Sequence, residues 1–308
     1  MNIQDRNQLL AERASLERMI ANLPESSVID RLSLEARKAA VEEALAAAPV
    51  PAHEPARARL RFRGRPVIGS HGIFAEFGAK AVNTFTDAVA AIGASQGTAL
   101  GTRGAIPNRE QFQLLITGTA PGSFGFELEE SLKNECLFPG FSQVDHAIEQ
   151  TRRIMEASLG SDDELTEAIV DADPRAIEAL RGFLQTLVEN EAVCDLELKD
   201  DVFRFRDLSQ VRRSVARLQQ DNIHEEDRSL VGRFLGVLPH RRSFEFQIAE
   251  PREIIVGKVG PNIEDAGNIN HVLGEDITIQ VHTKRAGTGR PTYTLLSYER
   301  PEQVAKSS

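Results

Sequence analysis

The sequence predicts an α+β protein built from an N-terminal helical hairpin, a central α+β body with antiparallel strands, and a small C-terminal β-barrel. Two amphipathic helical patterns separated by a proline open the chain, and helical and strand spacings are then mixed. The last 80 residues alternate like consecutive strands. Because no regular βαβ alternation occurs, we expect antiparallel strands instead of a parallel sheet.

The amino-acid composition limits the classes of protein to which this chain can belong. The 308 residues are 41% hydrophobic and 27% charged, which is typical of a globular protein with a substantial core. The net charge of −10 argues against a general nucleic-acid condenser. From Arg228 onward, however, 11 basic and 9 acidic residues give +2, so the acidity belongs to the preceding part of the chain.

The sequence also predicts the compartment. No apolar run approaches the roughly 20 residues of a membrane helix, and the charged N-terminus lacks the apolar core of a signal peptide. Cys136 and Cys194 have no CxxC spacing and are expected to be reduced thiols. We therefore expect a cytoplasmic protein without a membrane segment, and the alanine- and arginine-rich composition is typical of a bacterial source. No metal or other cofactor is expected, because the histidines have no metal-binding spacing.

Residues 1–48 predict the helical hairpin. A first helix is expected over 4–23, Pro24 interrupts it, and Ser26 or Ser27 can cap a second helix. Such a hairpin would pack on the body or on another copy of itself. Apolar residues keep a heptad-like spacing in the second helix: Leu34, Val41 and Leu45.

The α+β body is expected over 57–222, after a proline-bearing linker at 48–56. Its first strand should alternate arginines with Leu60 and Phe62, and Ser70 can cap the phenylalanine-bearing helix that follows. Further helices are expected at 142–158, 162–171, 174–190 and 209–222, with a strand pair at 193–207.

The stretch 114–130, LLITGTAPGSFGFELEE, predicts a β-hairpin with its turn at Ala120-Pro121-Gly122. It lacks the lysine and following helix of a phosphate-binding loop, and Gly122-Ser123-Phe124-Gly125 is not a nucleophile elbow. Glu127 and Glu129 fall on one face, opposite three apolar residues: Phe124, Phe126 and Leu128. Glycine within a strand often marks a close backbone approach, here of a helix or a ligand. The glycines concerned are Gly118, Gly122 and Gly125.

Residues 228–300 predict the small β-barrel. Three strands, a helix and two more strands follow in the order of an OB-like fold, although an SH3-like barrel or an open sandwich would give a similar string. Its two basic connections and an aromatic strand would bind phosphates and stack bases of single-stranded nucleic acid. The candidate nucleic-acid-binding residues are Arg241, Arg242, Lys284, Arg285, Arg290 and Tyr293.

Three functions remain open. The first is a non-enzymatic binding or assembly protein, whose partner is another protein chain or itself as a homo-oligomer, with nucleic acid at the barrel. The second is an enzyme with a carboxylate site near the 114–130 hairpin, using Glu127, Glu129 or His71. The third is an acidic inhibitor of a basic partner protein. Catalytic residues are not assigned by the sequence.

Overall fold

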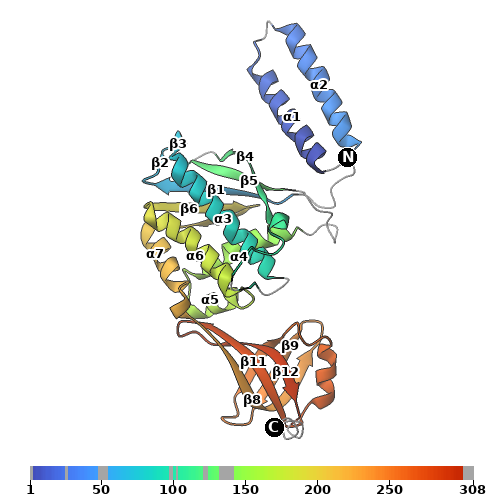
Figure 1. Cartoon of the computed structure of the whole chain (residues 1–308), viewed down its shortest axis with the longest axis vertical. Helices are drawn as coiled ribbons and strands as arrows, with labels where there is room; N and C mark the ends of the chain where they lie inside the picture. The colour runs from blue at the N-terminus through green and yellow to red at the C-terminus, as the bar shows by residue number, and fades with distance from the viewer. Residues whose placement is uncertain are drawn as a thin grey trace.

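A computed structural model of the chain describes residues 3–24, 27–47, 55–96, 100–101, 103–120, 124–131 and 142–300. The protein is α+β, as predicted, with helices at the N-terminus and mainly antiparallel sheets after them. Figure 1 shows a helical pair, a body of sheet and helices, and a C-terminal group of strands along the long axis. No described helix is long and apolar enough to cross a membrane.

Helices α1 (Ile3–Asn22) and α2 (Val28–Ala46) form the hairpin. Leu16 and Val41 are buried between them, and neither belongs to the core of the body or of the C-terminal strands. The ion pair of Arg37 with Glu12, at 2.7 Å, also joins the two helices. Ser27 occupies the N-cap position of α2, but its side chain accepts no capping hydrogen bond, and Ser26 lies outside the described residues.

The body contains a five-stranded sheet in the order β4-β5-β1-β6-β7, and every neighbouring pair is antiparallel. The central strand β1 alternates strictly, so that Ala58, Leu60 and Phe62 are buried on one face. The strands are β1 (Arg57–Gly64), β4 (Leu114–Ala120), β5 (Phe124–Glu130), β6 (Ala192–Leu198) and β7 (Asp201–Arg204).

Helices cover the buried face of this sheet, and α3 and α6 pack against each other in front of it (Figure 1). Phe85 of α3 meets Phe183 of α6 edge to face, with ring centroids 5.3 Å apart. Phe62 of β1 belongs to the same core, so helices and sheet share one apolar interior. The helices are α3 (Ala75–Ser95), α4 (Gln143–Ala157), α5 (Asp162–Ile169), α6 (Pro174–Glu189) and α7 (Leu208–Arg217).

The predicted cap of the phenylalanine-bearing helix is wrong. Ser70 lies in the turn between two short strands, β2 (Val67–Ile68) and β3 (Gly72–Ile73), and the N-cap position of α3 is Phe74. The chain makes this small extra hairpin before α3 begins, which places Ser70 too far from the first helical turn.

The C-terminal strands form a sheet that closes into a barrel in the order β10-β12-β11-β8-β9, with β10 parallel to β12. Strand β8 is long enough to pair with β11 in its first part and with β9 in its second. The two pairings overlap at Gly232, where a Cβ would lie 2.0 Å from the carbonyl oxygen of Gln247. The strands are β8 (Ile223–Leu238), β9 (Ser243–Ile248), β10 (Ile254–Val259), β11 (Ile277–Ala286) and β12 (Thr292–Glu299), with a 3-10 helix at Ala266–Val272.

The connection between β11 and β12 lies on the N-terminus of α5 and joins the barrel to the body. Asp162 accepts hydrogen bonds from the backbone and hydroxyl of Thr288, at 3.1 and 3.2 Å, and from Arg217 at 2.7 Å. The backbone hydrogen bond from Thr288, with further help from Arg217, lowers the pKa of Asp162. Gly289 permits this approach, because a Cβ there would lie 2.9 Å from the Asp162 carbonyl.

Candidate binding surface on the open face of the sheet

The face of the sheet opposite the helices carries a row of charged side chains. The alternation that buries Leu60 and Phe62 turns every second residue of β1 outward, and each of these is arginine. In the antiparallel register, carboxylates of β5 and β6 stand beside them on the same face. We call this set the charged ladder, and its members are Arg57, Arg59, Arg61, Arg63, Glu127, Glu129, Asp195 and Glu197.

Arg59 is the centre of the charged ladder. Its Nε lies 3.0 Å from Oε1 of Glu127, and its Nη1 lies 2.8 Å from Oε1 of Glu197. The hydrogen bond with Glu127 and then that with Glu197 raise the pKa of Arg59, so its charge is fixed. On one side Arg57 meets Glu129 at 3.1 Å, and on the other Arg61 meets Glu197.

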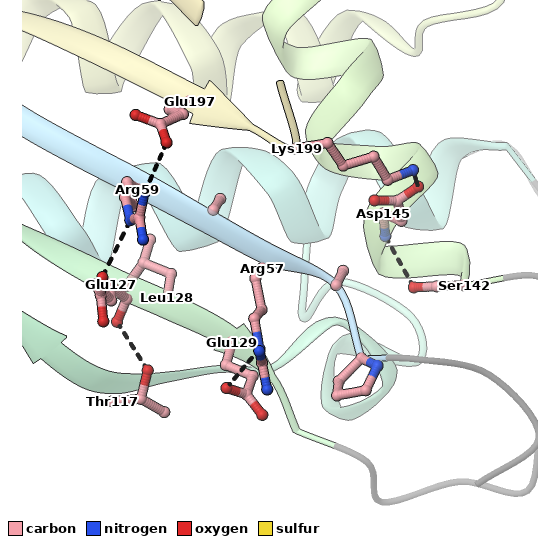
Figure 2. A pocket seen from close by; sticks show the side chains of 13 residues that line it. Arg57, Arg59, Thr117, Glu127, Leu128, Glu129, Ser142, Asp145, Glu197 and Lys199 are labelled. Carbon is pink, nitrogen blue, oxygen red and sulfur yellow. Dashed lines mark hydrogen bonds and ion pairs between the residues drawn. The ribbon is translucent and has the colours of Figure 1, made fainter. Parts of the chain in front are cut away.

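A hollow with a volume of about 560 Å³ lies at the end of the charged ladder near α4. Figure 2 shows Arg57 and Arg59 on β1 beside Glu129 and Glu127, with Lys199 and Asp145 on the far side. Lys199 Nζ lies 2.7 Å from Asp145 Oδ2, and this contact raises the pKa of Lys199. The hollow is therefore lined by charges of both signs that already pair with each other.

Two glycines of the 114–130 hairpin make room for the charged ladder. A Cβ on Gly125 would lie 2.4 Å from the carbonyl oxygen of Leu60 and 2.9 Å from Cγ of Arg61. A Cβ on Gly118 would lie 2.9 Å from a carboxylate oxygen of Glu127. The close approach that these glycines predict is thus made by β1 and by Glu127. Pro121 and Gly122 of the predicted turn lie outside the described residues.

The predicted division of this hairpin into two faces is confirmed. Leu128 is fully buried and Phe126 packs against the body core, whereas Glu127 and Glu129 point outward. Glu127 forms an ion pair with Arg59, and Glu129 forms one with Arg57.

His71 is exposed in the turn before β3 and does not line the hollow. Within the described ranges no three metal-binding side chains gather. The paired charges of the charged ladder are suited to recognising another charged surface.

Two of the residues predicted to bind nucleic acid are engaged inside the protein. Lys284 is only 5% exposed, and its Nζ lies 2.6 Å from the carbonyl oxygen of Ala172 and 2.7 Å from Glu225. The guanidinium group of Arg242 donates to the backbone carbonyls of Gly260 and Ile263, at 2.6 and 2.7 Å. Both cations therefore satisfy buried or partly buried acceptors within the protein, which does not suit the phosphate contacts expected of them.

The other four predicted residues are placed differently. Arg241 and Arg285 are exposed and have no ion pair within the part of the chain that the structure describes. Arg290 is exposed too, although its backbone N–H donates to Asp163 at 2.6 Å. Tyr293 packs against the barrel core, and burial raises its pKa. Its ring is therefore only partly available for stacking.

The charged ladder was not predicted from the sequence. The alternating arginines of β1 are visible in the sequence, but the carboxylates that pair with them come from β5 and β6, far along the chain. No protein-family model, curated protein or solved structure matches this chain.

Proposed function

We propose that this protein is a non-enzymatic binding protein and that the charged ladder, with its hollow, docks another protein chain. The observation that carries the proposal is the row of four outward arginines on the central strand, each paired with carboxylates of the flanking strands. The Arg57 and Arg59 side chains are exposed, whereas Asp195 is buried, so an approaching chain meets the Arg57–Arg59 end of the charged ladder.

Electrostatics supports a role in recognition. Exposed ion pairs contribute only about 0–1 kcal/mol each to folding, so the pairs of Arg57 with Glu129 and of Arg59 with Glu127 stabilise the fold modestly. Charges of both signs that are held in fixed positions favour a partner surface of complementary charge and disfavour surfaces that place like charges opposite them. The Arg57 side chain is 67% exposed and has one carboxylate partner, Glu129, so its guanidinium group can add a second carboxylate. The Arg59 side chain already pairs with Glu127 and Glu197 but is still 48% exposed.

The proposal is tested by affinity capture from the native host, followed by mass spectrometry. We expect the wild-type chain to capture a partner that the double variant Arg57→Gln/Arg59→Gln does not. Arg212 and Arg213 are adjacent, exposed arginines on α7, so Arg212→Gln/Arg213→Gln is the matched control and should keep the partner. Equal capture by both variants would contradict docking at the charged ladder. A basic partner whose own activity is blocked in the complex would identify the inhibitor version of this function.

A second function is favoured by the strand order of the C-terminal barrel. We propose that the barrel is OB-like, because its first strand pairs with both the second and the fourth, and its third and fifth strands are parallel. OB-folds bind oligonucleotides across the outer face of their sheet and the neighbouring loops. The exposed arginines Arg241, Arg285 and Arg290 would hold phosphates.

Fluorescence anisotropy with a labelled single-stranded oligonucleotide tests this second function. At low salt we expect binding that weakens as salt is added, since phosphate contacts release counterions. The triple variant Arg241→Gln/Arg285→Gln/Arg290→Gln should lose at least about tenfold in affinity, whereas Arg233→Gln, which removes an arginine paired with Asp276, should not. Absence of any binding by the wild-type chain at low salt would end the nucleic-acid proposal.

A further inference from the structure

Positive and negative charges are not balanced along the whole charged ladder. The first three arginines of β1 can each be matched with one carboxylate of a flanking strand. The remaining carboxylate, Asp195, is shared by two cations, Arg63 of β1 and Arg204 of β7. The side of the sheet next to β7 therefore carries one surplus positive charge. We call the set of Arg63, Asp195 and Arg204 the arginine clamp.

Asp195 holds both guanidinium groups of the arginine clamp in place. Its side chain is only 5% exposed, and its Oδ1 lies 3.0 Å from Nη2 of Arg63 while its Oδ2 lies 3.0 Å from Nε of Arg204. Arg63 Nη2 also donates to the backbone carbonyl of Phe205, at 3.0 Å. Because Arg204 stands directly opposite Asp195 in the register, both side chains lie on the open face. Arginines that are already held in this way lose little side-chain freedom when they bind a ligand.

The arginine clamp keeps hydrogen-bond donors available. The Arg204 side chain is 56% exposed and the Arg63 side chain is 41% exposed. A guanidinium group has five N–H donors, and Asp195 contacts Arg204 only through Nε. Among the described residues, no partner is found for the two terminal nitrogens of Arg204. The planar fork of such a group matches a carboxylate and binds it through two parallel hydrogen bonds.

The rest of the charged ladder favours a protein ligand over a uniform polyanion. Glu127, on the other side of β1, is 37% exposed, so a phosphate backbone lying across the sheet would meet a like charge there. A protein surface can instead place a carboxylate on the arginine clamp and a cation or an amide beside Glu127.

We therefore propose that the arginine clamp binds an aspartate or glutamate side chain of the docking partner. This inference rests on the proposed function, and it assigns to the partner an acidic contact on the β7 side of the sheet. The surplus positive charge attracts the carboxylate, and Asp195 keeps the two guanidinium groups in position to receive it.

Nuclear magnetic resonance of the arginine Nε–H groups tests the arginine clamp on the full chain, with the dipeptide acetyl-Glu-Glu-amide as the probe. We expect the Arg63 and Arg204 signals to shift in a saturable way, at least about threefold more than the signal of Arg212, an exposed arginine of α7. Acetyl-Gln-Gln-amide, which has a similar shape without the charge, should leave them unchanged. Signals that respond no more than that of Arg212, or that respond to inorganic phosphate but not to the glutamate dipeptide, would overturn the inference.

The affinity for the captured partner provides a second test. Arg204→Gln should bind that partner at least about fivefold more weakly than the wild type, whereas Arg212→Gln should bind it equally well. In Arg204→Gln the buried Asp195 still pairs with Arg63, so the sheet should stay folded, which urea unfolding checks.

The same measurement separates this inference from docking at the charged ladder. If Arg57→Gln/Arg59→Gln loses the partner and Arg204→Gln binds it as well as the wild type, the arginine clamp is wrong and docking at the charged ladder stands. If both variants bind the partner as well as the wild type, both proposals are wrong.

Discussion

Replacing Lys284 by methionine is expected to destabilise the protein by about 3 kcal/mol. The substitution keeps most of the apolar stem but removes the ammonium group that binds Ile169 and Ala172 carbonyls and pairs with Glu225. Those acceptors then remain at the junction of barrel and body without their donor, which costs more than the loss of an exposed ion pair. Urea unfolding followed by circular dichroism measures the change in the free energy of unfolding.

The neighbouring Arg285 provides the control for Lys284. It is exposed and has no ion pair among the described residues, so Arg285→Met should change the free energy of unfolding by less than about 0.5 kcal/mol. If both variants are as stable as the wild type, Lys284 does not hold the barrel on the body.

Replacing Gly125 by alanine is the second change with a large expected effect. The added Cβ would lie 2.4 Å from the Leu60 carbonyl oxygen and 2.6 Å from the Arg61 Cα, and neither backbone atom can move without opening the pairing of β5 with β1. We expect the free energy of unfolding to fall by about 3 kcal/mol, with loss of the charged ladder's register. Thermal and urea unfolding measure it.

A second glycine supplies the comparison for Gly125. Gly182 lies inside helix α6 and has nothing within 4 Å of an added Cβ, so Gly182→Ala should stabilise the protein by up to about 1 kcal/mol. If Gly125→Ala matches Gly182→Ala in stability, the close packing of β1 over Gly125 is wrong.

Local signals in the sequence were sufficient for most elements of the fold. The helix expected at 174–190 is α6, which starts at Pro174, and the Asp173 side chain before it accepts a hydrogen bond from the backbone N–H of Arg175. The α+β class followed from similar local patterns. Helix and strand periodicity depends on neighbours within a few residues, which is why these predictions succeed.

Contacts between distant segments could not be predicted. Asp162 reads from sequence as an acidic residue at a helix N-terminus, yet in the structure it also binds Thr288, 126 residues away. Arg242 and Lys284 look like cations of solvated loops, but burial depends on which element packs over the loop. The charged ladder depends in the same way on the register of β1 with β5 and β6, which alternation alone does not fix.

Docking at the charged ladder is tested by calorimetric titration of the captured partner into the purified chain, with urea unfolding of the same samples. We expect Arg57→Gln/Arg59→Gln to bind the partner at least about tenfold more weakly than the wild type, a change of about 1.4 kcal/mol. Because exposed ion pairs add little to folding, its free energy of unfolding should fall by no more than about 2 kcal/mol. Unchanged partner affinity in a variant with reduced stability would show that the charged ladder only stabilises the sheet.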